Sequence, residues 1–271
     1  MSRILVAGNI NHDCIWHLDR PLSSGARLSC LSRETRLGGG AYHTGMELLR
    51  LGATVLIAGT LMDDEAGRQA LASLRQSGFD TTHVTMTPGV TQSADILLDP
   101  RGERTIIAPP GRMRAPVSLN GPVSVDAVYV NASACADDLL AAMEATTFSM
   151  AQFPSRPDPR PADLLIGSAA DLKSRSLPDL WQDSRMIAGS RLSHLVITDG
   201  PGPVRIFNGE KIERANPPGR LSVPDTIGAG DTFAGALLHG VLTGQRVRDA
   251  AMEACRLTQA FLMARATIRE R

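Results

Sequence analysis

The chain has 271 residues, of which 43% are hydrophobic and 21% charged, a composition typical of folded globular enzymes that excludes disordered and collagen-like chains. Its 28 Lys and Arg residues are balanced by 28 Asp and Glu residues, and no window forms a basic stripe able to neutralise many nucleic-acid phosphates. We therefore expect one large α/β domain and no nucleic acid as a partner.

The cysteines and the apolar segments indicate the cellular compartment of the protein. Cys14, Cys30, Cys135 and Cys255 are scattered and form no C-x-x-C pair, so neither a zinc site nor a disulfide framework is predicted. The apolar run at residues 4–8 is too short for a signal peptide, and no segment reaches the roughly 18 apolar residues of a membrane span. We expect a cytoplasmic protein with no membrane partner.

The first elements alternate between strand and helix. The sequence predicts a buried strand at residues 4–8, an extra strand at 14–18, a helix at 41–51, a second buried strand at 53–59 and a helix at 65–76. The first helix is opened by three glycines and followed by Gly52, in the position where glycine is favoured after a helix. Such alternation is typical of a parallel sheet.

A β-hairpin signal interrupts this alternation. The predicted strands at residues 91–98 and 104–108 flank the turn sequence Asp-Pro-Arg-Gly at residues 99–102. We interpret them as part of a small β lid, formed by segments near 12–36 and 91–108.

Alternation returns in the second half of the chain. Strands are predicted at residues 125–130, 146–151, 162–166 and 194–198, and helices at 137–144, 178–190, 232–242 and 247–267. A pair of β-strands is predicted at 204–207 and 211–215. Residues 153–161 carry four prolines and cannot be helical, because proline removes backbone donors and clashes with preceding carbonyls.

The strongest local signal for a functional site precedes the first of the two C-terminal helices. Gly228, Ala229 and Gly230 leave backbone N–H groups accessible at a helix N-terminus, where the helix dipole also favours an anion. Asp231, in the first turn, could accept the proton of an acceptor hydroxyl beside a bound phosphate. The same spacing also permits a simpler interpretation, in which the glycines form a loop and Asp231 only caps the helix.

These motifs resemble those of a known family. The sequence D-T-I-G-A-G-D-T-F at residues 225–233 resembles the C-terminal signature of the ribokinase-like, or PfkB, carbohydrate kinases. The sequence G-G-G-A-Y-H-T-G at 38–45, followed by L-G-A at 51–53, resembles their N-terminal signature. Further matches occur at 6–13, at 59–67 and in the T-x-G at 198–200, so the resemblance covers nearly the whole chain in order.

The resemblance implies a fold, a reaction and an assembly. The expected fold is a ribokinase-like three-layer α/β/α sandwich with a mostly parallel central sheet and a small β lid. The expected reaction transfers the γ-phosphoryl group of ATP, with Mg²⁺, to a hydroxyl of a sugar. The resemblance also implies a homodimer formed through the lid, and it leaves open a monovalent cation as a further cofactor.

It further implies roles for individual residues. Asp231 would be the general base, and the backbone N–H groups of Gly228, Ala229 and Gly230 would stabilise the transferred phosphoryl group. His43 stands where the family signature usually has Asn. The residues expected to bind the acceptor are Asn11, Asp13, Gly38, Gly39 and His43. Asn131 is expected to bind it as well, on a different ground, because it stands at the end of the predicted strand at 125–130.

On the nucleotide side, Thr198 and Gly200 match the family's phosphate loop, and Thr226 is expected to contact ATP as well. Ser168 and Asp171 align with the family's N-x-x-E motif, which serves magnesium and phosphates. We therefore expect Ser168 to bind ATP and Asp171 to serve the metal, although both depart from the family's residue types.

These departures keep three functions open. The first is an active carbohydrate kinase, with a ketose or a modified ketose as the expected acceptor. The second is a ligand-binding pseudokinase that has lost productive handling of ATP and Mg²⁺. The third is a nucleoside kinase of the same family.

Overall fold

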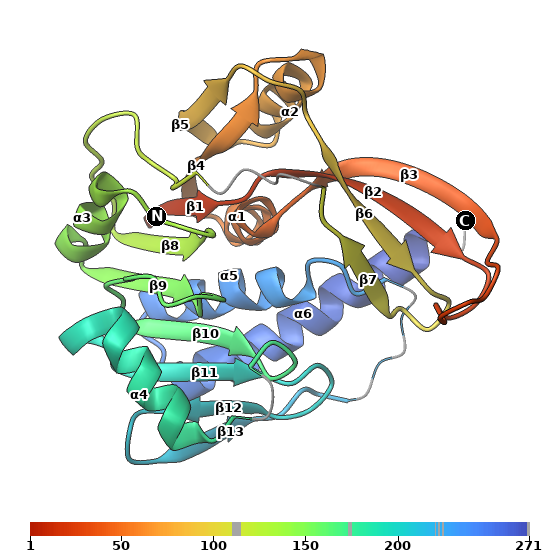
Figure 1. Cartoon of the computed structure of the whole chain (residues 1–271). Coiled ribbons are helices and arrows are strands. Elements are labelled where there is room, and N and C mark those ends of the chain that lie inside the picture. Colours follow the sequence, from red (N-terminus) through yellow and green to blue (C-terminus); the bar gives the residue numbers. More distant parts are fainter. Residues whose placement is uncertain (110–114, 173–174, 220, 222, 224, 270–271) are drawn as a thin grey trace.

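A computed structural model describes residues 1–109, 115–172, 175–219, 221, 223 and 225–269 of the chain. The strands of its larger sheet are β1 (Arg3–Gly8), β4 (Thr54–Met62), β5 (Asp80–Thr87), β8 (Ala127–Asn131), β9 (Phe148–Gln152), β10 (Leu164–Ser168), β11 (His194–Thr198), β12 (Val204–Phe207) and β13 (Ile212–Ala215). They lie side by side in the order β13-β12-β11-β10-β9-β8-β1-β4-β5 (Figure 1).

The larger sheet is mostly parallel. Every pairing from β5 across to β11 is parallel, and only the pairings of β11 with β12 and of β12 with β13 are antiparallel. The carboxyl ends of the parallel strands therefore meet at one edge, where Gly8 pairs with Asn131 and Ser168 pairs with Thr198. Ligands of open α/β sheets bind outside this edge.

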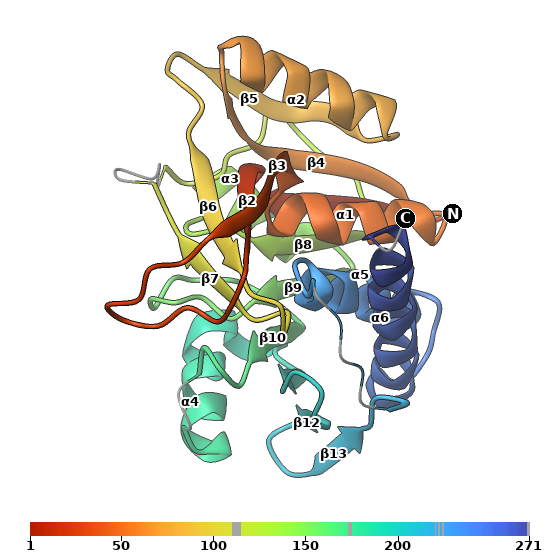
Figure 2. The same ribbon diagram turned by 90° about the vertical axis from the view of Figure 1, so that its right-hand side faces the viewer.

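Helices cover both faces of this sheet. The helices α1 (Gly40–Arg50), α2 (Glu65–Gln76), α5 (Ala229–Leu242) and α6 (Val247–Arg269) pack on one face, and α3 (Asp137–Ala145) and α4 (Leu177–Ala188) pack on the other (Figure 2). Because side chains alternate along a strand, Ile4 and Val6 of β1 enter the first core while Leu5 and Ala7 enter the second. The predicted three-layer α/β/α architecture is confirmed.

A smaller sheet stands beside the larger one and forms the lid (Figure 1). Its strands are β2 (Asn11–Leu18), β3 (Cys30–Gly38), β6 (Ser93–Leu98) and β7 (Arg104–Ile107), in the order β3-β2-β6-β7. Ile15, Ile96 and Leu98 form its small core together with Ile227, which comes from the loop before α5. The lid therefore buries its inner face against a residue of its own chain.

Local sequence signals account for most elements. Helix α2 has the predicted bounds, and the Asp64 side chain caps it by accepting a hydrogen bond of 2.8 Å from the Gly67 N–H. The sequence did not predict β3 or β5. Strand β3 is exposed along most of its length and β5 is a largely polar edge strand, so neither shows the alternation that marks a half-buried strand.

Two further observations concern the cysteines and the length and polarity of the helices. All four cysteines are free thiols, and Cys14 and Cys255 are buried. Within the described ranges, each helix is too short or too polar to cross a lipid bilayer.

Candidate active site

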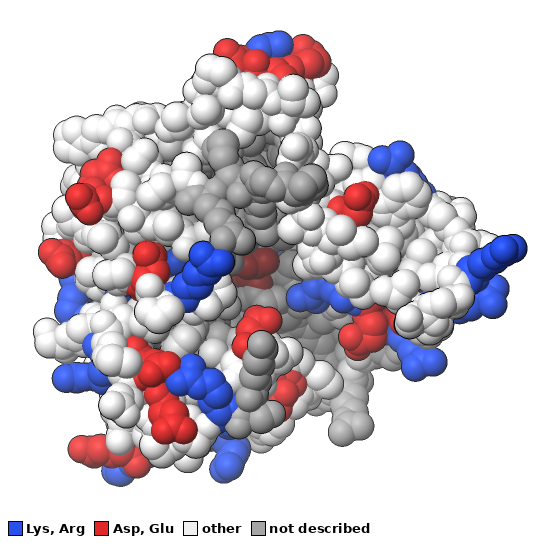
Figure 3. Space-filling model, viewed as in Figure 1, with Lys and Arg blue, Asp and Glu red and all other residues white. Residues whose placement is uncertain are grey.

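The candidate site lies between the lid and the carboxyl edge of the larger sheet, where the surface is hollowed (Figure 3). Acidic and basic side chains both lie on the visible face around this hollow, without a large area of one sign. Four segments that are distant in sequence contribute residues: β2, the glycine run before α1, the end of β8 and the start of α5.

Glycine is needed at residues 38 and 39 because neighbouring polar groups occupy the space that a side chain would fill. A Cβ at Gly38 would lie only 1.8 Å from the Oδ2 atom of Asp13, whose side chain is buried in β2. A Cβ at Gly39 would lie 2.3 Å from the Asn9 carbonyl oxygen, and Gly39 also has a φ of 92°, which favours glycine. The structure thus brings Asp13, Gly38 and Gly39 together as predicted, with Asn11 at the start of the same strand.

Two further glycines, Gly8 and Gly40, lie close against Asn131. A Cβ at Gly40 would lie 2.0 Å from the Asn131 Nδ2 atom, and a Cβ at Gly8 would lie 2.2 Å from the Asn131 carbonyl oxygen. The Asn131 amide donates a hydrogen bond of 3.0 Å to Oδ1 of Asp231. Asn131 therefore contacts the expected base directly, a role that its position at a strand end did not reveal.

The environment of Asp231 raises the pKa of its carboxyl group to about 6. Burial is the largest cause and the charge of Asp13 adds to it, whereas the charge of Arg104 and the hydrogen bond from Asn131 lower the pKa. The Thr44 hydroxyl donates to the Asp231 backbone carbonyl at 3.2 Å. A carboxylate with this pKa can accept a proton near neutral pH.

The loop before α5 forms a helix N-terminus of the predicted kind. Gly228 is the N-cap residue and has a left-handed φ of 80°, and the Thr232 N–H donates to its carbonyl at 2.8 Å. The Ala229 N–H donates to the Thr226 carbonyl at 3.2 Å, inside the turn. Among the described residues, no backbone acceptor is found for the N–H groups of Gly228 and Gly230. These two groups remain able to bind an anion.

Three consecutive residues of this loop contact the lid. The Thr226 hydroxyl donates to the Gly102 carbonyl at 3.0 Å and accepts a hydrogen bond of 3.2 Å from Arg104. Ile227 completes the core of the lid, as described above. The sequence predicted Thr226 as an ATP contact, and the structure adds these contacts to the lid hairpin.

The third contact is an ion pair. Asp225 is buried, and its carboxylate accepts a hydrogen bond of 2.9 Å from Arg36 of β3. The two residues are 189 positions apart in sequence, so no local pattern could predict this pair. Burial opposes ionisation of Asp225, but the hydrogen bonds from Arg36 and the Ile227 N–H, together with the charges of Arg265 and Arg36, outweigh it and lower the pKa of Asp225.

His43 lies under the same loop. A Cβ at Gly228 would lie 3.0 Å from the Cγ atom of its imidazole ring. Its Nε2 atom is buried without a hydrogen-bond partner in the described part of the chain. Burial, followed by the charges of Arg265 and Arg36, lowers the pKa of His43 to about 4, so the ring is neutral at physiological pH. Its expected contact with the acceptor stays a prediction.

The predicted nucleotide residues lie at the ends of β10 and β11. Ser168 and Thr198 are paired across the two strands, and the Thr198 hydroxyl donates to the Gly167 carbonyl at 3.3 Å. Gly200 has a left-handed φ of 51° and is exposed in the loop that follows. Asp171 is also exposed, in the turn after β10, where its N–H donates to the Ser168 carbonyl at 3.1 Å. Ser168, Thr198 and Asp171 are thus neighbours in the structure, and the binding of ATP and metal by these four residues stays a prediction.

The described residues suit a magnesium ion that is bound together with substrate phosphates. Among the described residues, no three His, Cys, Asp or Glu side chains form a cluster that could hold a metal ion. Mg²⁺ commonly keeps several waters and is bound through one or two carboxylates together with substrate phosphates. The exposed carboxylate of Asp171 fits an ion that arrives with ATP.

Comparison with known proteins relates this geometry to a family. The model of the pfkB family carbohydrate kinases matches residues 1–269. The chain is similar to an ATP-dependent ribose-1-phosphate kinase of Halopiger xanaduensis, with 27% identity over an alignment of 269 residues. The alignment covers 92% of this chain and 88% of that relative.

Solved structures share the fold. A ribokinase of Thermotoga maritima matches with a TM-score of 0.75 at 14% identity, and a ribokinase of Giardia lamblia matches with a TM-score of 0.75 at 16% identity. Each match covers 97% of this chain and 93% of the solved chain. Since the family model spans almost every residue of the chain, the protein belongs to the pfkB family and is an ATP-dependent carbohydrate kinase.

Proposed function

We propose that this kinase phosphorylates a hydroxyl of a ribose-based acceptor, with Asp231 as the general base. The observation that carries the proposal is the pair of carboxylates, Asp13 and Asp231, which interact electrostatically beside the N-terminus of α5. The buried Asp13 carboxylate suits hydrogen bonds from sugar hydroxyls. The raised pKa of Asp231 suits removal of a proton from one of them.

The proposed step conserves charge and atoms. The acceptor hydroxyl oxygen forms a bond to the γ-phosphorus of ATP while the bond from that phosphorus to the β-phosphate oxygen breaks. The hydroxyl proton moves to Asp231, and ADP leaves with the electron pair of the broken bond. The N–H groups of Gly228 and Gly230 stabilise the charge on the phosphoryl oxygens during the transfer.

Two groups complete the nucleotide side of the proposal. Ser168, Thr198 and Gly200 bind the phosphates of ATP at the ends of β10 and β11. Asp171 holds Mg²⁺, which neutralises phosphate charge when it is bound. No monovalent cation is included, because Asp225 of the loop before α5 (residues 225–230, the anion loop) is already paired with cationic side chains.

A ribose-based acceptor is favoured over a ketose by two observations. The curated relative at 27% identity is named as a ribose-1-phosphate kinase. In addition, Arg104 of the lid is near enough to Asp231 to lower the pKa of its carboxyl group. A guanidinium at this place would attract a phosphate on the acceptor. We therefore extend the proposal to ribose 1-phosphate as the preferred acceptor.

The experiment is a steady-state measurement of ATP consumption with ribose, ribose 1-phosphate, ribonucleosides and fructose. We expect the highest kcat/KM with ribose 1-phosphate, followed by ribose. Preference for a nucleoside would replace the proposal with a nucleoside kinase, and preference for fructose would restore the ketose. ATP binding without consumption on any acceptor would identify a pseudokinase.

We propose a reducing, cytoplasmic compartment, which suits the free cysteines.

We also propose a homodimer through the lid. Because Ile227 packs against the inner face of the lid, a second chain would pair with its outer parts. Strand β7 is an edge strand that is exposed throughout, and its Ile106 and Ile107 are each more than half exposed. Such edges invite pairing with another chain. Sedimentation at micromolar concentration should give a dimer mass for the wild type and a monomer mass for Ile107→Lys.

A further inference from the structure

The side of the anion loop that faces the C-terminal helix carries two oxygen atoms in contact with one guanidinium. Nη1 of Arg265, from α6, lies 3.5 Å from Oδ2 of the buried Asp225 and donates a hydrogen bond to the backbone carbonyl of Ile227. The Ile227 N–H in turn donates to Oδ1 of Asp225 at 2.9 Å. Arg265 thus bridges the carboxylate at the start of the loop and a carbonyl next to the N-cap residue of α5.

A carboxylate and a backbone carbonyl are also the ligands that a monovalent metal ion takes in proteins. Here both oxygens contact a guanidinium, and Arg36 supplies a second one to the same carboxylate. An added K⁺ or Na⁺ would have to displace Arg265 or stand beside two positive charges, which repel it. These residues therefore do not fit a monovalent ion at this place.

Arg265 is held in position by its own helix. Its guanidinium stacks over the Phe261 ring at 4.8 Å, one turn earlier in α6, and its side chain is only 20% exposed. The guanidinium is always charged and presents several donors in a fixed plane. His43, the ring beside Gly228, is neutral, so it adds no competing charge.

We propose that Arg265 is a built-in cation that holds the anion loop in the conformation able to stabilise the transferred phosphoryl group, and that this kinase consequently needs no monovalent cation. Arg265 acts through the loop and is a positioning residue. The inference rests on the proposed function, because its main readout is phosphoryl transfer.

The test compares wild type with Arg265→Ala and Arg265→Lys in tetramethylammonium, sodium and potassium buffers. The kcat of the wild type should change by less than about twofold among them. Arg265→Ala should lose at least about tenfold in kcat, the effect of removing a charged hydrogen bond, and recover part of it on addition of millimolar guanidinium or potassium. Arg265→Lys should keep more activity than Arg265→Ala.

A matched control comes from the same helix. Arg256 is exposed and pairs with Glu253, so Arg256→Ala removes an equal charge without touching the loop. Its kcat should equal that of the wild type in every buffer, and guanidinium should have no effect on it.

Melting temperatures provide a readout that needs no turnover. Potassium, compared with tetramethylammonium, should not raise the melting temperature of the wild type but should raise that of Arg265→Ala, because an ion that binds only the folded state stabilises it. This measurement keeps the inference testable if no acceptor is turned over, a result that would contradict the proposed function alone.

The inference is overturned if the wild type requires potassium for activity or is stabilised by it specifically. It is also overturned if Arg265→Ala keeps full activity, or loses activity that neither guanidinium nor potassium restores. If Arg265→Ala does not fold, the response of the wild type and of Arg265→Lys to potassium decides the question.

Discussion

On the acceptor side of the site, Asp13 and Asn131 fill spaces that a side chain at Gly38 or Gly40 would occupy, with atoms less than about 2 Å from the missing Cβ positions. On the nucleotide side, Asp171 and Gly200 lie exposed at the ends of their strands. The proposed acceptor side is therefore closely packed, whereas the proposed nucleotide side is open to solvent. Substitutions should have larger effects on the acceptor side.

The largest expected effect in this comparison is that of Gly38→Ala. The new methyl group would occupy the place of the Asp13 carboxylate, so Asp13 must turn away from the acceptor. Loss of a charged hydrogen bond costs about 1.5–3 kcal/mol, so kcat/KM for the acceptor should fall by about 10- to 100-fold while ATP affinity is kept.

The control for this prediction is Gly219→Ala. Among the described residues, a Cβ at Gly219 would meet nothing closer than the Gln259 side chain at 4.0 Å. Its steady-state constants should match those of the wild type. Normal kcat/KM in Gly38→Ala would mean that Asp13 does not bind the acceptor.

A smaller effect, on pH dependence, is expected for Asn131→Ala. In the wild type, kcat/KM should rise with pH through about 6, as Asp231 loses its proton, and then level off. The Asn131 hydrogen bond lowers the pKa of Asp231, so its removal should move the acidic limb to higher pH, by about one pH unit.

Asn208→Ala is the matched control for the pH measurement. Asn208 lies in the turn between β12 and β13 and bonds only that turn's backbone in the contacts described. Its pH profile should coincide with that of the wild type. An unchanged profile in Asn131→Ala would remove Asn131 from the tuning of the base.

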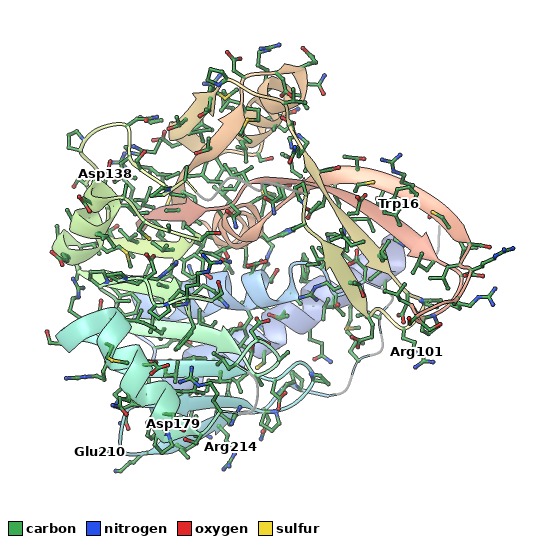
Figure 4. All side chains as sticks on the ribbon, in the orientation of Figure 1. Trp16, Arg101, Asp138, Asp179, Glu210 and Arg214 are labelled. Atoms are coloured by element: carbon green, nitrogen blue, oxygen red, sulfur yellow. The ribbon has the colours of Figure 1, made fainter. Side chains whose placement is uncertain are left out.

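The smallest effect is expected on the nucleotide side. Asp171→Ala removes an exposed carboxylate, and interactions of exposed charges are weakened by solvent. The KM for ATP should rise by no more than about tenfold, with the acceptor KM unchanged. Glu210→Ala, which removes an exposed charge from the far end of the sheet, should change neither value (Figure 4). A loss above 100-fold in Asp171→Ala would contradict the contrast between the two sides.

The sequence was informative where function and fold depend on local patterns. The glycine-rich segments at residues 38–40 and 228–230, most strands and most helices follow from short-range spacing, and the structure contains these elements, with some strand ends shifted by two or three residues. Strands β3 and β5 were missed because exposed or polar strands carry no alternation of burial.

Contacts between distant segments could not be predicted. Asn131 and Asp231 are 100 positions apart, and Asp225 is paired with residues from both the lid and the C-terminal helix. The pairs of Asp225 form because the lid and α6 both pack against the loop before α5. Residue spacing along the sequence does not predict such packing. The same applies to His43, whose burial by that loop removes the titration near neutrality that an exposed imidazole would show.

The central claim is that Asp231 removes the proton of the acceptor, and the direct measurement is kcat for Asp231→Asn together with ATP affinity by calorimetry. Asparagine keeps the size of the side chain but cannot accept the proton. We expect kcat to fall by at least about 100-fold, a barrier increase of about 2.7 kcal/mol, with ATP affinity and melting temperature close to those of the wild type. Asp249→Asn, which changes an acidic residue in the first turn of α6, should keep normal turnover. Near-normal turnover in Asp231→Asn would contradict the assignment of Asp231 as the base.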